Sequence, residues 1–211
     1  LLGVVLEHSD PVHKVTIIPR GMALGVTMQL PLDDKHNYAT PYLNDQLAVL
    51  LGGRIAEEIT NTVVTTGAGN DLDRVTELAR KMVCDWGMSE TIGPLTFGRK
   101  EEEVFLGRDL AQHKDYSEET ANQIDQEIKR IVTENYDRAR AILEGKKSEL
   151  LQIAEELLTR EVLSGGQVKQ IVSGQPLDAL PAASDELDQS TIPETEHPPV
   201  VPPLGKPLPQ E

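Results

Sequence analysis

The residue of this sequence best placed to do chemistry is Asp71, which stands at the start of an expected helix. It follows residues 65–70, Thr-Thr-Gly-Ala-Gly-Asn, a glycine-rich segment that leads into the helix. Aspartate at such a position most commonly caps the helix or complements its dipole. A carboxylate fixed there can also complete a metal site. On residue chemistry alone, capping or dipole complementation is the favoured interpretation of Asp71, and metal ligation is the alternative.

The same glycine-rich segment raises the possibility of a phosphate site, because a helix start can cradle phosphate with its backbone N–H groups. No lysine follows it as in a P-loop, and the carboxylates of Asp71 and Asp73 repel phosphate. A phosphate-binding module built on residues 67–71 is therefore an alternative of little weight.

The other reactive side chains do not form a complete catalytic constellation. Glu57 and Glu58 are adjacent, so they point in different directions and at most one faces a site; a solvated face is the favoured interpretation. Cys84 is the single cysteine and has no histidine nearby in the sequence, which predicts a buried, inert thiol. The five histidines include no pair spaced i, i+4, so no helix of the chain offers a two-histidine metal face.

Hydrophobic spacing predicts a mainly α-helical domain with a small β-sheet and edge strand near the N-terminus. β-Branched runs stopped by prolines indicate two strands, and apolar residues at intervals of three to four indicate helices. The expected strands cover residues 15–18 and 25–30, and the expected helices cover residues 41–59, 70–86, 117–143, 146–160 and 167–172. We expect the third and fourth helices to form an antiparallel hairpin. Gly52 and Gly53, in the first helix, indicate close approach by another backbone, because each costs about 1 kcal/mol relative to alanine.

Composition and charge disfavour several classes of protein. The 211 residues hold 35 Asp and Glu against 20 Lys and Arg, a formal charge of −15 that disfavours general nucleic-acid binding. No apolar run approaches the roughly 18 residues of a transmembrane helix. A single cysteine excludes a disulfide framework and a cysteine-based zinc cluster, and it fits a reducing compartment.

The last 38 residues differ in composition from the rest. Residues 174–211 hold 9 of the 14 prolines, and 7 acidic residues against one base, Lys206. Because proline removes backbone donors and like charges oppose collapse, we expect a disordered, acidic, proline-rich C-terminal tail. We therefore divide the chain into a domain of residues 1–173 and a tail of residues 174–211.

Five phrases of the sequence are specific when they are taken together and in order. They are residues 13–21 (His-Lys-Val-Thr-Ile-Ile-Pro-Arg-Gly), 51–59 (Leu-Gly-Gly-Arg-Ile-Ala-Glu-Glu-Ile), 66–72 (Thr-Gly-Ala-Gly-Asn-Asp-Leu), 86–95 (with Trp-Gly-Met-Ser-Glu and Gly-Pro-Leu) and 103–108 (Glu-Val-Phe-Leu-Gly-Arg). Together they closely resemble the peptidase domain of the FtsH family, which are membrane-anchored, ATP-dependent zinc metalloproteases. The resemblance covers about residues 1–172 and leaves out the tail.

The resemblance implies a helical metallopeptidase domain whose Zn²⁺ is held by two histidines of an HExxH helix and by an aspartate further along. It places that aspartate at Asp71, with Glu57 as the runner-up in a supporting or alternative role. The strand expected at residues 25–30 is similar to the edge strand that pairs with an extended substrate. The residues expected to bind substrate there are Gly25, Val26, Thr27 and Met28.

The HExxH motif of the family is not in this sequence, and the resemblance places it just before Leu1. We therefore expect no catalytic residue in the chain, because the glutamate that would deprotonate zinc-bound water is missing together with both histidines. The ATPase module that would bind ATP and the membrane anchor are missing as well. We interpret the chain as a family member truncated within or just after its catalytic helix.

Two functions from different classes follow. For the parent protein, the resemblance implies an ATP-dependent zinc endopeptidase that degrades unfolded or misassembled proteins as a homohexamer. It would lie at the cytoplasmic face of the bacterial inner membrane, or the organellar equivalent, without a nucleic-acid partner. For the chain as given, the alternative is a catalytically incompetent helical module for oligomerisation or interaction.

Overall fold

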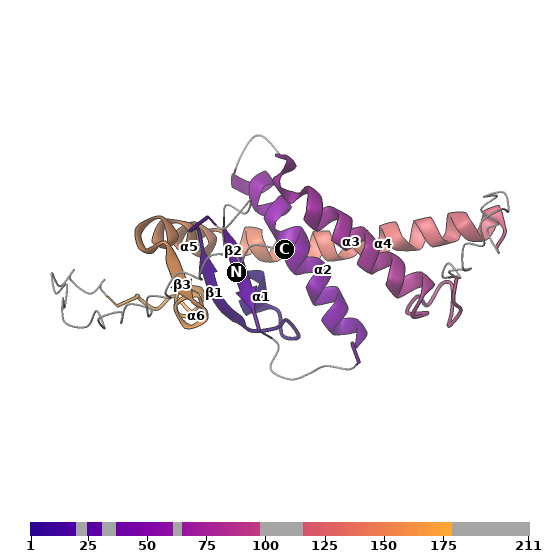
Figure 1. The fold of residues 1–211 in the computed structure, drawn as a ribbon, viewed down its shortest axis with the longest axis horizontal. Helices are drawn as coiled ribbons and strands as arrows, with labels where there is room; N and C mark the ends of the chain where they lie inside the picture. The colour runs from indigo at the N-terminus through magenta and orange to yellow at the C-terminus, as the bar shows by residue number, and fades with distance from the viewer. Residues whose placement is uncertain (20–24, 31–36, 61–64, 98–115, 179–211) are drawn as a thin grey trace, which may run out of the picture. The chain divides into compact units, whose positions relative to one another are not determined.

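The structure, a computed structural model, describes residues 1–19, 25–30, 37–60, 65–97 and 116–178, which belong to one unit, Leu1–Asp178. In chain order the elements are α1 (Leu2–Val5), β1 (Val12–Thr16), β2 (Val26–Gln29), α2 (Thr40–Thr60), the 3-10 turn η1 (Thr66–Ala68), α3 (Gly69–Cys84), α4 (Glu118–Gly145), α5 (Lys147–Arg160), β3 (Val162–Ser164) and α6 (Gly165–Val172) (Figure 1). The prediction of a mainly helical fold with a small sheet near the N-terminus is confirmed.

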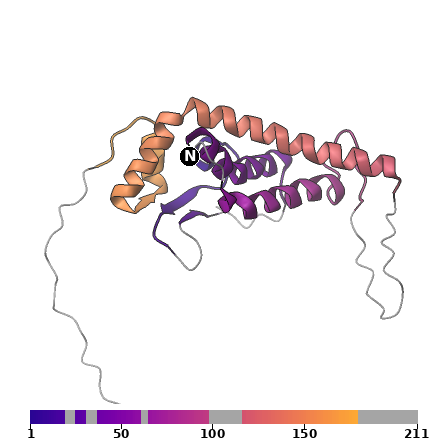
Figure 2. The same cartoon turned by 90° about the horizontal axis from the view of Figure 1, so that it is seen from above.

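Three long helices, α2, α3 and α4, form what we call the helical bundle. The long α4 packs against both α2 and α3 (Figure 2). Each helix buries an apolar stripe because its hydrophobic residues recur every three to four positions. The most deeply buried large side chains of this core are at most 2% exposed: Leu47, Leu51, Ile55, Val75, Met82, Val83 and Ile124. The predicted stripes are thus the faces that meet.

The three strands β1 to β3, together with α5 and α6, form what we call the sheet end. Its strands are ordered β2-β1-β3, and both pairs are antiparallel. Val15 of β1 pairs with Thr27 on β2 and with Leu163 on β3. The two predicted strands are confirmed as a pair. The strand β3 was not predicted, because three residues are too few to show an alternating pattern and their partner lies far away in the sequence.

The sheet end has its own small core, which corrects one prediction. Ile153 and Leu157 of α5 pack with Leu163 of β3 and with Val168 and Ile171 of α6. In Figure 2, α5 leaves the end of α4 at a steep angle instead of running back along it. The expected antiparallel hairpin of these two helices is therefore wrong: the apolar stripe of α5 is covered by α6 and β3, while that of α4 is covered by α2 and α3.

Helix termini explain where several elements begin. Ser117 caps α4, since its side chain accepts a hydrogen bond from the backbone N–H of Thr120, and Ser164 forms a capping box with Gln167 at the start of α6. Within the described residues, every helix is too short or too polar to serve as a membrane span. The predicted tail lies outside the described residues from position 179 onward.

Candidate metal and substrate site

Asp71 lies in the first turn of α3, with its side chain 42% exposed. It does not cap the helix: the N-cap position is Ala68, and Thr65 supplies the side-chain cap of the preceding turn η1. Its carboxylate therefore complements the helix dipole without accepting a capping bond. Arg74 Nη1 lies 4.0 Å from Asp71 Oδ1, the limit of an ion pair. This carboxylate is held by the helix and reachable from solvent.

Glu57, the runner-up carboxylate, lies near the end of α2 and binds the segment that precedes α3. Its Oε1 accepts from the hydroxyl of Thr65 at 2.6 Å, and its Oε2 accepts from the backbone N–H of Thr65 at 3.1 Å. The Thr65 hydroxyl in turn accepts from the N–H of Gly67 at 3.1 Å. The two bonds that Glu57 accepts from Thr65, the one from the hydroxyl above all, hold the pKa of Glu57 below its ordinary value. Both oxygens are engaged in fixing the approach to Asp71, which favours the supporting role over ligation.

The residues expected to bind substrate lie at β2, an edge strand. Val26, Thr27 and Met28 belong to β2, while Gly25 precedes it. A Cβ on Gly25 would stand 2.8 Å from the backbone oxygen of Thr16, so only glycine fits this close approach to β1. Among the described residues, β2 pairs with β1 on one side and with no strand on the other. A free edge of this kind can pair with an extended polypeptide.

The short helix α1 lies between this edge strand and the bundle. A Cβ on Gly3 would stand 2.7 Å from Gln29 Nε2 on β2, and a Cβ on Gly52 of α2 would stand 2.6 Å from Leu2 Cδ1. Gly52 therefore makes room for a side chain of α1, where we expected a backbone. Gly53 has no atom within 4 Å of such a Cβ, so the expectation of close approach fails there.

The described residues do not complete a zinc site. A catalytic zinc needs three protein ligands, and no group of three or more His, Cys, Asp or Glu gathers in the part of the chain that the structure describes. Of the five histidines, His36, His113 and His197 fall outside that part. Cys84 is buried, and its burial raises the pKa of the thiol, which confirms the prediction of a buried thiol. Asp71 thus offers one possible zinc ligand, and the described residues supply no second and third ligand beside it.

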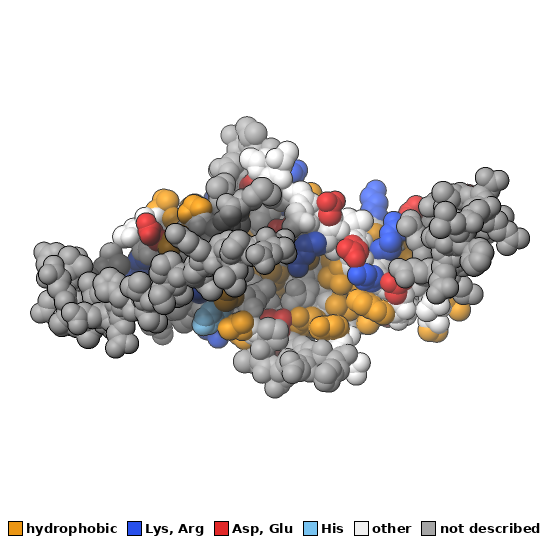
Figure 3. All heavy atoms as spheres, in the orientation of Figure 1, with side chains coloured by type: hydrophobic (Ala, Val, Ile, Leu, Met, Phe, Trp, Pro, Cys, Tyr) orange, Lys and Arg blue, Asp and Glu red, His pale blue; other side chains and the backbone are white. Residues whose placement is uncertain are grey.

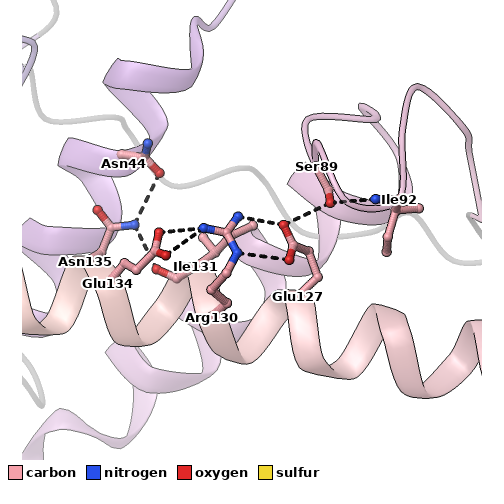
Figure 4. A network of polar contacts seen from close by, with 8 residues as sticks. All are labelled: Asn44, Ser89, Ile92, Glu127, Arg130, Ile131, Glu134 and Asn135. Atoms are coloured by element: carbon pink, nitrogen blue, oxygen red, sulfur yellow. Dashed lines mark hydrogen bonds and ion pairs between the residues drawn. The ribbon is translucent and has the colours of Figure 1, made fainter.

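A partly buried polar network joins α4 to the loop after α3, and sequence reasoning missed it (Figure 4). Arg130 donates two hydrogen bonds to the carboxylate of Glu127, from Nε to Oε2 at 3.0 Å and from Nη2 to Oε1 at 2.6 Å. It also binds Glu134. The hydroxyl of Ser89 donates to Glu127 at 2.9 Å and accepts from the N–H of Ile92 at 3.1 Å. The available signal was a glutamate at helical spacing within a mostly apolar stripe of α4, which also contains Asn135.

A shallow groove of about 260 Å³ runs between α2 and α3. Its walls include Tyr38, Tyr42, Leu78 and Trp86, and Arg74 lies at its border. Figure 3 shows hydrophobic side chains gathered over these two helices beside acidic and basic ones. The groove thus places apolar surface next to Arg74, the residue whose guanidinium lies near Asp71.

Comparisons with known proteins give a consistent answer. The family described as "Peptidase family M41" matches residues 1–171. Three proteins named "ATP-dependent zinc metalloprotease FtsH" are similar to the chain. The one from Acidobacterium capsulatum is 48% identical over 216 residues, covering 99% of the chain and 34% of the relative. The one from Magnetococcus marinus is 52% identical over 178 residues (84% and 26%), and the one from Thermotoga maritima is 47% identical over 174 (82% and 28%).

The extent of these matches defines what they establish. The chain spans about a third or less of the length of the relatives, at 34%, 26% and 28%. The matched part, residues 1–171, contains every helix and strand described above except the last residue of α6. The resemblance seen in the sequence phrases is confirmed, and the chain belongs to peptidase family M41.

Proposed function

We propose that this chain is the peptidase-domain segment of a membrane-anchored, ATP-dependent zinc endopeptidase that degrades unfolded or misassembled proteins. The family match and the names of the relatives support the reaction class. The observation that carries the proposal is the solvent-accessible carboxylate of Asp71 in the first turn of α3. The segment just before this helix is held by the contact between Glu57 and Thr65. Homohexamer assembly and a site at the cytoplasmic membrane face, or its organellar equivalent, are parts of this proposal that rest on the family alone.

Asp71 is proposed as one zinc ligand of the parent protein, and the family's two histidines and glutamate would come from residues that this sequence does not contain. Zinc in such a site supplies an acidified water and polarises the peptide carbonyl. Because the described residues do not complete the site, we assign no step of the hydrolysis to them. Their proposed contribution is to hold one carboxylate in place, through the α3 backbone and the Glu57–Thr65 contact.

The edge strand β2 is proposed to bind the substrate backbone by adding a strand to the sheet. Backbone pairing is independent of side-chain identity, which suits a protease that must accept many unfolded sequences. The free edge of β2 among the described residues supports this role. Gly25 contributes by letting the start of β2 approach β1 closely.

The test compares Asp71→Asn with Asp73→Asn in the full-length parent protein. Both are carboxylates in the same turn of α3, and Asp73 is exposed. We expect D71N to lower bound zinc and casein hydrolysis by more than about tenfold, since removing a ligand weakens a site at least as much as disturbing its surroundings. D73N should keep both within about twofold of the wild type. Stoichiometric zinc and unchanged hydrolysis in D71N would overturn the assignment.

A second function, a helical module for oligomerisation or interaction without catalysis, has one observation in its favour. No metal-holding group of three exists among the described residues. The two functions differ in the zinc content of the purified 211-residue chain at neutral pH. Zinc bound in a one-to-one ratio would exclude the non-catalytic module, and its absence would support that module for the chain in isolation.

A further inference from the structure

A buried carboxylate that the proposed zinc site does not use is Asp45, on the first half of α2. Its side chain is 3% exposed, although aspartate is rarely buried this deeply without a partner. Taking a charged carboxylate out of water is unfavourable unless hydrogen bonds and an opposite charge compensate it. The groups that compensate Asp45 therefore show which parts of the molecule it joins.

Two groups from different elements bind the two oxygens of Asp45. The Nη2 of Arg138, on α4, donates to Oδ1 at 2.7 Å. The backbone N–H of His8, which lies between α1 and β1, donates to Oδ2 at 2.9 Å. Asp45 thus connects the helical bundle to residues 6–11, which we call the linking segment.

The linking segment is bound from its other side by β2. The side-chain amide of Gln29 donates to the hydroxyl of Ser9 at 3.2 Å and to the backbone oxygen of Asp10 at 3.0 Å. The backbone N–H of Leu30, just after β2, donates to the oxygen of Pro11 at 3.1 Å. A continuous polar path therefore runs from α4 and α2, through the linking segment, to the proposed substrate strand.

A second contact between α2 and the linking segment lies one helical turn before Asp45. The hydroxyl of Tyr42 donates to the carboxylate of Asp10 at 2.7 Å. Burial and this bond raise the pKa of Tyr42 well above its ordinary value, so the hydroxyl remains a donor at all physiological pH values. These contacts of α2 reach the linking segment at His8 and at Asp10, and the one made by Asp45 also reaches α4.

We propose that Asp45 is a positioning residue that holds β2 in place through the linking segment. The inference rests on the proposed function for the role of β2 as the substrate strand. β2 has four residues and, in the described part of the chain, a partner strand on one side only. So short an edge is weakly fixed by its own ladder, and the path through Gln29 supplies the missing constraint.

The first measurement is amide hydrogen exchange in the full-length protein, comparing Asp45→Asn with Glu127→Gln. Glu127 is a matched control because it too is a buried carboxylate bound by a partly exposed arginine, but it joins α4 to the loop of Ser89. We expect D45N to speed exchange of the amides of residues 26–29 by about tenfold, since local opening requires less free energy without the constraint. E127Q should leave those amides unchanged.

The second measurement separates binding from chemistry. If β2 binds substrate, D45N should raise the KM for casein by about tenfold while kcat stays within about twofold, because a loosened strand weakens ground-state binding. Gln29→Ala should shift KM in the same direction. The double variant should have a KM no higher than that of D45N alone, because both changes break the same polar path between α2 and β2. Gln29→Ala also serves if D45N does not fold.

Each outcome decides between the two proposals. Unchanged exchange at residues 26–29 in D45N and Q29A, or equal acceleration in E127Q, would overturn the positioning role of Asp45. Faster exchange with an unchanged KM would support that role and count against β2 as the substrate strand, which belongs to the proposed function. Faster exchange with a raised KM would support both. Loss of zinc in D71N tests the proposed metal site independently of either result.

Discussion

The helical bundle and the sheet end hold their candidate residues by different physical means. Among the described residues, the bundle core has sixteen buried members, whereas the core of the sheet end has five. Asp71 lies on a helix whose buried face is part of the larger core. The strand β2 contributes no residue to either core, and hydrogen bonds to the linking segment hold it in position. Apolar packing thus fixes the helix that carries the proposed ligand, whereas hydrogen bonds fix the proposed substrate strand.

This difference has a consequence for how the two parts respond to change. Burial of apolar surface is non-directional and grows with area, so a large core tolerates loss of any one polar contact. Hydrogen bonds are directional, and the loss of one partner leaves the other unsatisfied. We therefore expect the bundle to be sensitive to volume and the sheet end to be sensitive to contact geometry.

The largest expected effect is the loss of a buried side chain from the bundle. Leu47→Ala removes a fully buried residue at the centre of the larger core. We expect a loss of about 2–5 kcal/mol in the free energy of unfolding, because deleting a fully buried side chain removes its apolar burial and leaves a cavity in the core. Chemical denaturation measures this change.

The matched variant for Leu47→Ala is Leu163→Ala, in the sheet end. Leu163 is equally buried, at 0% exposed, but it packs in the smaller core. Leu163→Ala should lower the free energy of unfolding by an amount at the lower end of the same range of about 2–5 kcal/mol, since the smaller core offers fewer packing contacts to lose. If Leu163→Ala costs more than Leu47→Ala, the contrast between the two cores is wrong.

An intermediate effect is expected at Gly165, where α6 begins against β1. A Cβ at this position would overlap the backbone oxygen of Val12. Gly165→Ala should lower the free energy of unfolding by about 3 kcal/mol, the upper end for overpacking, because a backbone atom cannot change rotamer to make room as a side chain can. Thermal unfolding provides the measurement.

The control for that prediction is the next residue along the chain. The nearest atom to a Cβ on Gly166 is the Ser164 Oγ at 3.7 Å, an ordinary contact. Gly166→Ala should be neutral or stabilising by up to about 1 kcal/mol, since alanine favours the helix. A similar loss for both glycines would show that helix geometry at this end, and not the contact with β1, sets stability.

The smallest effect concerns the charge network of the bundle in acid. Hydrogen bonds from Arg130 hold the pKa of Glu127 below its ordinary value, and Ser89 adds to this. Because the folded-state pKa is the lower one, its stabilisation is complete above the unfolded value of about 4.3 and is lost as the pH falls through the folded pKa. Glu127→Gln should cost about 1 kcal/mol at pH 7, a value limited by the partial exposure of Arg130.

The measurement for this prediction is urea denaturation at a series of pH values. Below the unfolded pKa of about 4.3, the gap between wild type and E127Q should narrow, because the wild-type carboxyl becomes neutral. A gap that stays constant through this pH range would mean that the network contributes packing and not charge.

Much of the bundle could be predicted from the sequence, because the reasons for it are local. The spacing of Leu43, Leu47, Leu51 and Ile55 defines one buried face of α2 whatever lies against it. The caps at Ser117 and Ser164 are local features of the same kind, because capping needs only a side chain and the next turn of the chain. At Asp71 the structure supports dipole complementation and not capping, because η1 precedes α3, Thr65 caps η1, and Asp71 lies in the first turn of α3.

The candidate site could be predicted only in part. The resemblance to a family singles out Asp71 and the strand around Val26, whereas residue chemistry alone favours a role for Asp71 as a cap or as a complement to the helix dipole. The contact between Glu57 and Thr65 depends on how α2 and α3 are placed, which no pattern of single residues records. The same holds for Asp45, whose partners are 37 and 93 residues away in the sequence.

The sequence by itself determined which faces of the helices are buried, where several of them begin, and the family to which the chain belongs. Only the tertiary structure decided that α5 turns away from α4 to cover the sheet, that β3 completes the sheet, and that a polar path ties β2 to the bundle. The physical reason is range. Periodicity and capping act within one or two turns of chain, whereas a strand partner or a buried ion pair is chosen by whatever surface the rest of the fold brings within hydrogen-bonding distance.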